Sequence, residues 1–320
     1  MWFEHLLSIF VFPGFLFIIL IALVYEWIDR KLYAIFQNRV GPWITGPSGF
    51  LQPIADFIKL LTKEDITPEG ADMLIFRSIP VFSLALALMC SLFLPILNHR
   101  GLVSFEGDLI AAIALMTLLS IMFFYAGLSS PSRFSIVGAE RAMLQLLSYE
   151  IPLMLSIASV AVSTGSLSIV GAVEAQMGRW LIIGLNMLSF IVFLLAAQAE
   201  LERIPFDIPE AETEIVAGWL TEFSGRKLAL LRLTKDVELF YLSGLATTLF
   251  LGGPLGPVTP GLEWLLHPVY FTIKSLAVLF LLSLLKSIFA RLRVDEAVNF
   301  LWKYIIPLSV LQFLLVRVVA

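Results

Sequence analysis

Long, nearly uninterrupted runs of apolar residues alternate with polar connections along most of the chain. A helix needs about 20 mostly apolar residues to cross a bilayer, whereas a strand of a membrane barrel shows roughly ten residues of alternating polarity. The runs therefore predict an all-α integral membrane protein with eight transmembrane helices. The eight segments are Leu6–Trp27, Ile79–Leu97, Leu109–Leu128, Ile151–Ile169, Trp180–Ala199, Val237–Leu251, Phe271–Leu285 and Leu301–Val319. The sixth and seventh are short, so we expect the flanking residues Leu228–Asp236 and Thr272–Ile288 to extend them.

The composition agrees with a membrane protein and not with two soluble domains. Of the 320 residues, 59% are hydrophobic and 14% are charged, and the mean hydropathy is +0.93. We expect a single membrane domain over residues 1–320. The single cysteine, Cys90, excludes a disulfide scaffold and a cysteine-ligated iron–sulfur cluster within the chain. The net charge of −4 is too small to indicate a nucleic-acid partner.

The distribution of lysine and arginine predicts the orientation in the cell membrane, because basic residues concentrate in cytoplasmic loops. Of the 21 basic residues, 17 lie in or beside the odd-numbered loops, which we therefore place in the cytoplasm with both termini outside. They are Arg30, Lys31, Arg39, Lys59, Lys63, Arg77, Arg133, Arg141, Arg203, Arg226, Lys227, Arg232, Lys235, Lys286, Arg291, Arg293 and Lys303. No cleavable signal peptide is expected, because the first apolar run lacks a basic flank at its start.

The first inner loop contains an amphipathic pattern at residues 49–63. Its apolar positions share one helical face, and its charged positions, among them Asp56 and Lys59, share the other. We expect an amphipathic helix that lies in the membrane plane. A short soluble helix packed on a partner is the alternative, and the two are compatible.

The region 200–236, which we predict to be an acidic cytoplasmic loop, and the two residues after it hold nine of the 25 acidic residues. These are Glu200, Glu202, Asp207, Glu210, Glu212, Glu214, Glu222, Asp236 and Glu238. The pattern predicts a helix after Pro209, with Glu210 and Glu214 on one face and Glu212 roughly opposite. Crowded carboxylates raise one another's proton affinity, as a proton relay requires. A solvated loop whose acids face water is an equally good interpretation.

Several isolated polar residues elsewhere in the chain are either structural or functional. Glu26 and Asp29 lie beside Arg30 and Lys31, which favours a local ion pair. Glu150 begins the fourth predicted helix without a nearby basic residue, which favours a functional role. The histidines His5, His99 and His267 are single, so no pair for haem at membrane depth is expected. No phosphate-binding loop, metal-ligand spacing or nucleophile motif is present, and no residue is assigned a catalytic or metal-binding role.

The cytoplasmic motifs together resemble the complex I membrane subunit that carries the letter H in bacteria and the number 1 in mitochondria. The resemblance rests on Asp29–Lys31, Gln37–Pro42 and Gly49–Asp65, on Gly138–Ala142 and Ser148–Glu150, on Pro205–Gly218 and Thr221–Gly225, and on Arg291–Asp295, Trp302–Lys303 and Pro307–Ser309. These motifs follow one another in the same order as in the family and span nearly the whole chain.

The resemblance implies a non-catalytic subunit that anchors the peripheral redox arm and links it to ion pumping, with eight spans. It implies an acidic path toward antiporter-like subunits through Glu150, Glu200, Glu210, Glu212, Glu214 and Glu222, to which this chain adds Asp236 and Glu238. It places Asp29, Arg39, Asp56, Lys59, Arg203 and Asp207 at the redox chamber or at contacts with the peripheral arm. No cofactor is expected in this chain.

Several departures from the family pattern indicate a particular branch. Members of complex I typically read Ala-Glu-Tyr-Ala-Asn where this chain reads Thr234–Glu238, so that Lys235 replaces an acid. Trp43 stands where Asn is usual, and Glu140 stands at a normally apolar place. These differences favour the corresponding subunit of membrane-bound energy-converting nickel–iron hydrogenases of the archaeal type, which evolve hydrogen from ferredoxin and export H⁺ or Na⁺.

On this interpretation the partners are the nickel–iron and iron–sulfur subunits, the antiporter-like subunits and small membrane subunits. Two alternatives remain. In the first, the chain is the quinone-chamber subunit of an NADH:quinone oxidoreductase, and quinone is bound. In the second, it is a stand-alone ion transporter, which would show inverted repeats. Four Asn, six Gln and one Cys favour a thermophilic source.

Overall fold

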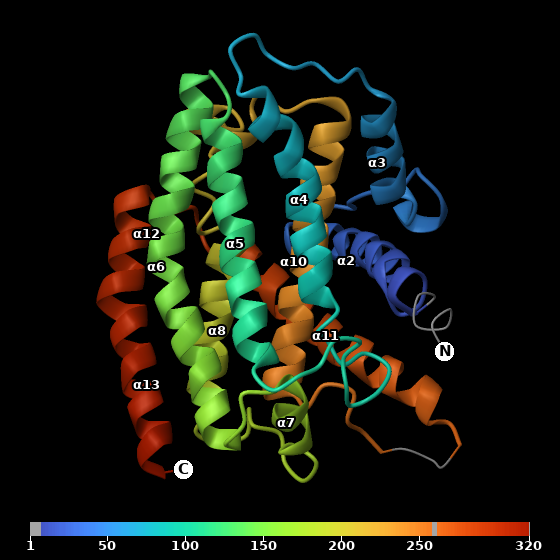
Figure 1. The fold of residues 1–320 in the computed structure, drawn as a ribbon, viewed down its shortest axis with the longest axis vertical. Coiled ribbons are helices and arrows are strands. Elements are labelled where there is room, and N and C mark those ends of the chain that lie inside the picture. Colours follow the sequence, from blue (N-terminus) through green and yellow to red (C-terminus); the bar gives the residue numbers. More distant parts are fainter. Residues whose placement is uncertain (1–7, 258–260, 320) are drawn as a thin grey trace.

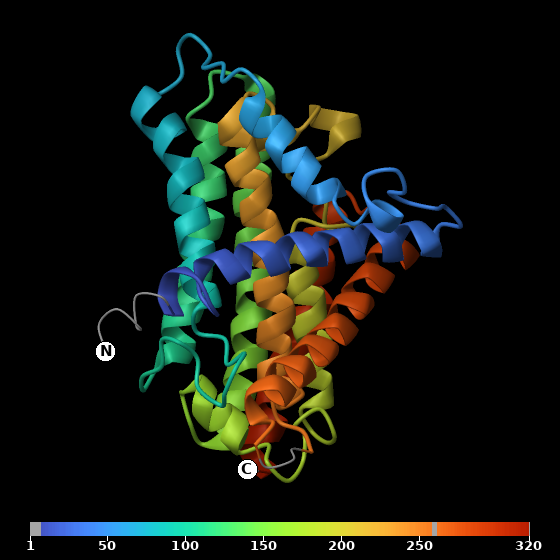
Figure 2. The ribbon, with the colours of Figure 1, turned by 90° about the vertical axis from the view of Figure 1, so that its right-hand side faces the viewer.

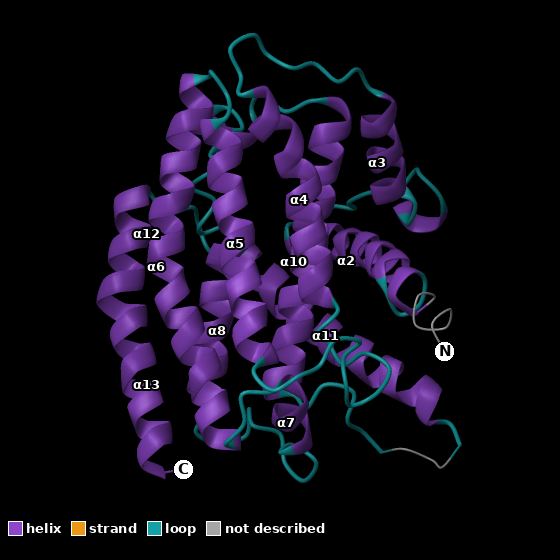
Figure 3. Ribbon diagram, in the orientation of Figure 1, coloured by secondary structure: helices purple, strands orange, loops and turns teal. Residues whose placement is uncertain are grey.

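A computed structural model describes residues 8–257 and 261–319. Within these ranges all the regular secondary structure is helical, without strands, which confirms the all-α part of the predicted fold class (Figure 1 and Figure 3). The long helices are α2 (Phe15–Phe36), α4 (Met73–Ser91), α5 (Asp108–Leu128), α6 (Arg133–Thr164), α8 (Met187–Glu200), α10 (Gly225–Phe250), α11 (Glu263–Ile288) and α13 (Ile306–Val319). The short ones are η1 (Pro47–Gly49), α3 (Gln52–Thr62), α7 (Ile169–Glu174), α9 (Glu212–Ile215), η2 (Gly218–Leu220), α12 (Val294–Phe300) and η3 (Leu301–Ile305).

Six helical segments of the described chain are long and apolar enough to cross a membrane. They are Ser8–Phe36, Met73–Ser91, Asp108–Leu128, Arg133–Thr164, Glu263–Ile288 and Val294–Val319. The fifth and sixth segments of the sequence prediction are not among the six. α8 is apolar but has only 14 residues, and α10 carries Lys235, Asp236 and Glu238 along its length. The count of eight spans therefore stays a prediction for α8 and α10.

Several predicted helix ends were wrong, because polar residues continue a helix beyond its apolar run. α6 begins at Arg133 instead of Ile151, so Glu150, expected at the start of a helix, lies near the middle of one. α6 ends at Thr164, where Gly165 takes a left-handed conformation with φ 65°. α8 begins only at Met187, after turns that replace the predicted helical start at Trp180.

The extension of the sixth and seventh segments is confirmed, since α10 begins at Gly225 and α11 ends at Ile288. Part of the predicted acidic loop 200–236 consequently belongs to α10. The start of the first predicted segment, at Leu6, lies outside the described residues.

α10 is the central helix of the bundle. Its side chains from Val237 to Phe250 are buried, because α2, α4 and α11 pack around it. Tyr25 of α2 lies edge-on to Phe240 of α10, with the ring centroids 5.2 Å apart. Figure 2 shows that α2 runs across α10 instead of alongside it. The polar second half of α2 is thereby directed toward α3 and the start of α10.

The connections group at two ends of the bundle. Three of the four loops predicted to be cytoplasmic lie in the upper part of Figure 1, around α3, the start of α6 and the start of α10, and α7 lies at the lower end. The fourth, between α11 and α12, lies nearer mid-height. α3 confirms a helix within residues 49–63, with Pro53 and Leu60 buried and with Ile58 and Lys59 exposed. An orientation of this helix in the membrane plane stays a prediction.

Candidate functional site

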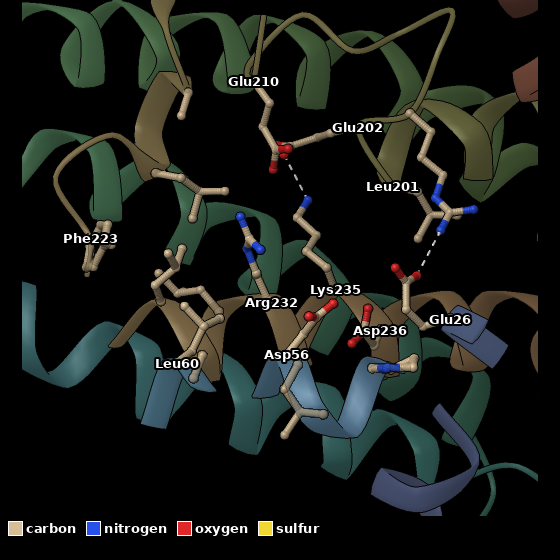
Figure 4. A pocket seen from close by; sticks show the side chains of 18 of the residues that line it. Glu26, Asp56, Leu60, Leu201, Glu202, Glu210, Phe223, Arg232, Lys235 and Asp236 are labelled. Atoms are coloured by element: carbon tan, nitrogen blue, oxygen red, sulfur yellow. Dashed lines mark hydrogen bonds and ion pairs between the residues drawn. The ribbon is translucent and has the colours of Figure 1, made fainter. Parts of the chain in front are cut away.

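A cavity of about 540 Å³ opens between α2, α3, α10 and the loop that follows α8. Seven acidic and five basic side chains line it, and Figure 4 shows several of them converging. They are Glu26, Asp56, Glu202, Asp207, Glu210, Glu212 and Asp236 with Arg30, Arg203, Arg232, Lys235 and Lys286. The apolar part of the wall includes Leu23, Leu60 and Phe223. Such a concentration of charge inside a membrane protein is typical of a functional site.

Arg30 joins two walls of the cavity. Its guanidinium donates to Glu26 at 2.6 Å, one helical turn earlier on α2, and to Asp56 of α3 at 2.8 Å. Burial acts to raise the pKa of Asp56, but the hydrogen bonds from Arg30 and Gln52 outweigh it and hold the pKa below its usual range. Asp56 is therefore an anion that fixes α3 against α2.

A second ion pair fixes the loop after α8. Arg203 donates to Asp29 of α2 at 3.0 Å, and Ser283 and Lys286 of α11 contact the same carboxylate at 2.6 and 3.4 Å. The Asp29 side chain is 2% exposed. Both residues were predicted to line the chamber or to contact the peripheral arm. In the structure Arg203 lines the cavity, and Asp29 lies beneath it, where it holds three elements together.

At the deep end of the cavity, Lys235 of α10 lies between two glutamates. Its ammonium is 2.8 Å from Glu202 and 3.8 Å from Glu238, and Figure 4 shows Glu202 and Glu210 pointing toward it. The indole of Trp219 also donates to Glu202, at 3.1 Å. Lys235 and Glu202 line the cavity, whereas the Glu238 side chain is fully buried behind them.

A tight turn positions the Trp219 indole next to this group. Gly218 has φ 54°, and a Cβ there would lie 1.6 Å from a backbone carbonyl oxygen, so the turn requires glycine. A Cβ on Gly138 of α6 would lie 2.6 Å from the backbone nitrogen of Trp219. The two glycines let the loop approach α6, and Trp219 stacks on Phe123 with the ring centroids 4.7 Å apart.

Beyond Glu238, further acids lie inside the bundle. Glu200 is 3% exposed, and one of its carboxyl oxygens and both of those of Glu238 lack a hydrogen-bond partner among the described residues. Glu150 of α6 accepts a hydrogen bond from Thr117 of α5 at 2.6 Å. Buried carboxyl oxygens without partners need a bound proton or water.

Two acids of the loop after α8 retain their protons more strongly than usual. Burial in the cavity wall, followed by the nearby charge of Glu202, raises the pKa of Glu210 to about 8. Burial also raises the pKa of Asp207 to about 6, although Arg291 opposes it. At neutral pH the Glu210 carboxyl in the cavity wall is therefore mostly protonated.

The chain is similar to known proteins over almost its whole length. A family model described as NADH dehydrogenase matches residues 9–317. The chain belongs to this family. It is 40% identical over 309 residues to the H subunit of NADH-quinone oxidoreductase from Dehalococcoides mccartyi (strain CBDB1), an alignment that covers 96% of this chain and 84% of the relative. It is 39% identical over 305 residues to the equivalent protein of Thermomicrobium roseum, with 89% and 87% covered. It is 37% identical over 293 residues to that of Brevibacillus brevis, with 92% and 87% covered.

Membership of the NADH dehydrogenase family confirms the resemblance found in the motifs. The relatives are named as quinone oxidoreductase subunits, so the expected closeness to hydrogenase subunits is not shown. They support the quinone-chamber alternative better than the hydrogenase interpretation.

The acids of the α9 region lie differently from the prediction. The helix expected after Pro209 is a single turn, Glu212–Ile215, because Val216 with φ 65° ends it. Glu212 lines the cavity, and Glu214 turns outward to pair with Arg141 of α6. The hydrogen bond from Arg141 lowers the pKa of Glu214. Glu222 is half-buried and does not line the cavity.

Three predicted contact residues lie near the surface of this family member. Arg39 is exposed, stacks its guanidinium 5.9 Å from the Tyr33 ring centroid and lines a smaller hollow of about 360 Å³. Lys59 is exposed on α3, and Asp207 lines the main cavity.

Sequence reasoning missed four of the five cavity cations, Arg30, Arg232, Lys235 and Lys286, as site residues. Only the spacing of Glu26 and Arg30, four residues apart, gave a signal, and we interpreted it as a local pair. That pair is confirmed for Glu26, and it also lines the cavity. The local pair expected for Asp29 was wrong, because Asp29 pairs with Arg203 and Lys286 from other elements. His99 and His267, predicted to be single, lie with their ring centroids 5.0 Å apart, while His5 lies outside the described residues.

Proposed function

We propose that the chain is the chamber-forming and coupling subunit of a quinone-reducing, complex I-like assembly. Its upper loops would hold the peripheral redox arm, the cavity would receive the quinone headgroup, and the buried acids would relay charge toward neighbouring membrane subunits. Family membership and the names of the relatives support the proposal. The observation that carries it is the continuity from the charged cavity, through Glu202 and Lys235, to the buried acids Glu238 and Glu200.

The residues of the cavity fit this role chemically. A quinone carries a polar ring and an apolar tail, and the wall offers charged groups beside Leu23, Leu60 and Phe223. On reduction a quinone takes up protons, and a carboxyl with a raised pKa is matched to supplying them. Glu210 is such a donor. In this proposal the chain binds the quinone and supplies protons, whereas the electrons come from clusters in the partner subunits.

The proposal includes an orientation. The loops at the upper end of Figure 1 carry most of the lysines and arginines, which supports a cytoplasmic location for the cavity mouth. Both termini would then lie outside, and α8 and α10 would complete eight spans.

A hydrogenase-type assembly is the second candidate, and one observation favours it. The buried cation Lys235 occupies a place where the family pattern has an acid. The partners would then be nickel–iron and iron–sulfur subunits, and the exported ion H⁺ or Na⁺. A thermophilic source also stays a prediction.

The purified intact complex distinguishes the two candidates. Quinone is extracted from its lipids, and two reactions are assayed side by side: quinone reduction with NADH, and hydrogen evolution with reduced ferredoxin. We expect quinone reduction without hydrogen evolution. Hydrogen evolution in a complex that contains no quinone would overturn the main proposal in favour of the second candidate.

A further inference from the structure

Lys235 stands at the boundary between the cavity and the buried acids. Glu202, on the cavity side, is 8% exposed, and Glu238, on the inner side, is 0% exposed. The ammonium is bound to the first at 2.8 Å and lies 3.8 Å from the second. Glu210, on the cavity side with Glu202, also faces the ammonium. Carboxyl groups on the two sides therefore compete for one cation, and a shift of about 1 Å would bring the ammonium as close to Glu238 as it now is to Glu202.

The surroundings allow this movement. The ammonium lies 4.2 Å from the ring centroid of Phe123 and 5.7 Å from that of Trp219. Attraction to an aromatic face is less directional than a hydrogen bond, so it holds a cation without fixing it to one acceptor. The Trp219 indole, in contrast, donates to Glu202 at 3.1 Å, so that Glu202 keeps one partner when the ammonium leaves.

Glu238, on the inner side, lacks the hydrogen bonds that Glu202 has on the cavity side. Both carboxyl oxygens of Glu238 are without a hydrogen-bond partner among the described side chains and backbone groups, and so is one oxygen of Glu200. A buried carboxyl in that position is neutralised either by a proton or by a nearby cation. Lys235 is the cation within reach of Glu238. The position of its ammonium therefore decides whether Glu238 holds a proton.

From this geometry we propose that Lys235 is a switch between the cavity and the buried acids. With the ammonium on Glu202, Glu238 holds a proton. When the ammonium moves to Glu238, the O–H bond of Glu238 breaks, and its proton passes through water to Glu200. Glu200 forms a new O–H bond with this proton and gives its own proton to the carboxylate of Glu150. Glu202 then takes a proton from a hydronium ion in the cavity. The ammonium keeps its three protons throughout, so Lys235 is a positioning residue.

The inference deepens the proposed function and rests on it, so the test includes both. The complex is reconstituted in liposomes, and electron transfer and exported charge per electron are measured. Lys235→Met is expected to assemble and to lower exported charge per electron at least about tenfold, and Lys235→Arg to restore most of it. Lys227→Met is the matched control: Lys227 lies on the same helix and pairs with Asp65 at 2.9 Å, outside the cavity. It is expected to export normally.

Normal export by Lys235→Met would overturn the inference. If this variant does not assemble, Glu202→Gln with Lys235→Met removes both charges of the pair and is assayed instead; normal export by the double variant would equally overturn it. Glu238→Gln and Glu200→Gln test the acid path itself. Normal export by Glu238→Gln and Glu200→Gln would contradict the proposed function. Loss of export by these two variants, together with normal export by Lys235→Met, would contradict the switch alone.

Infrared difference spectra separate a switch from a purely structural role. A carboxyl band that changes on reduction of the complex and is absent in Glu238→Gln reports the proton on Glu238. In Lys235→Met this band is expected to persist without changing on reduction. A normal change of the band in that variant would overturn the inference.

Discussion

At the scale of single residues, the ion pairs of the cavity differ in burial, and their energetic roles differ accordingly. Asp29 is almost fully buried against Arg203, whereas Asp56 and Arg30 are about one-third exposed. Removing one partner of a buried pair costs about 3–5 kcal/mol, and an exposed pair contributes about 0–1 kcal/mol. Asp29→Ala is expected to destabilise the protein by about 3 kcal/mol, and Asp56→Ala by less than about 1 kcal/mol. Unfolding in detergent measures both, and equal losses would contradict the assignment.

The acid Glu210 gives a pH dependence with a definite sign. Its pKa is raised by burial and by Glu202, from 4.5 to about 8. The folded protein binds this proton more tightly than the unfolded chain. The stabilisation is therefore complete below about pH 4.5 and is lost as the pH rises through about 8. Thermal unfolding of Glu210→Gln is expected to show a flatter decline between about pH 4.5 and 8 than the wild type.

Glu214→Gln is the control for this measurement. Its pKa is lowered by the hydrogen bond from Arg141, so the stabilisation by its carboxylate is present at neutral pH and is lost on acidification. The decline between about pH 4.5 and 8 should therefore remain in Glu214→Gln. Identical declines over this range in Glu210→Gln and the wild type would show that the pKa of Glu210 is not raised.

Single residues were predicted from the sequence only where the partner is local. The Glu26–Arg30 pair follows from a spacing of four on a helix. Arg203 and Asp29, 174 positions apart, are joined by the crossing of α2 over the bundle, which no periodicity reveals. The acids were found because they are concentrated in one region. Of the cavity cations, Arg203 was predicted, whereas Lys235 and Lys286, which come from separate helices, were missed.

At the scale of elements, the approach of α6 to the η2 turn depends on Gly138. A methyl group there would lie 2.6 Å from the backbone nitrogen of Trp219 and 2.8 Å from the backbone of Gly218. Backbone atoms cannot move away as the end of a flexible side chain can. Gly138→Ala is therefore expected to lower the free energy of unfolding by roughly 1–3 kcal/mol and to displace Trp219. Gly178→Ala, with nothing within 4 Å of the added carbon, is the control. Unfolding midpoints and tryptophan fluorescence measure the two effects, and equal stability would contradict the predicted clash.

The helices themselves were predictable because burial in a bilayer imposes long apolar runs. Their ends were not, since α6 and α10 continue through polar sequence that the neighbouring elements stabilise. The region 201–224 was predicted least well. Its two prolines indicated a break, but the left-handed residues Val216 and Gly218 reduced the expected helix to one turn. The cavity exists because this segment folds back over α10.

At the scale of the whole molecule, the first inner loop presents an uncovered surface. Trp43 is 64% exposed and Ile44 is 94% exposed, and Arg39 and Lys59 are exposed nearby. Large exposed apolar side chains flanked by charges are typical of a protein interface. This agrees with the proposed contact with the peripheral arm, because the loop that carries this surface leads into α3, which lines the cavity.

The salt dependence of arm retention tests this surface. Exposed ion pairs are screened once the Debye length falls to about 3 Å at 1 M salt, so Arg39→Ala is expected to weaken binding of the arm by about 1 kcal/mol at low salt and by less at high salt. The retained fraction of peripheral subunits is measured by gel filtration of the intact complex over a salt series. Arg317→Ala is the control, because Arg317 is exposed near the end of α13, at the opposite end of the bundle. If the arm binds this surface, Arg39→Ala loses peripheral subunits in a salt-dependent way and Arg317→Ala does not. Equal retention of the arm by both variants at every salt concentration would show that the arm binds elsewhere on the molecule.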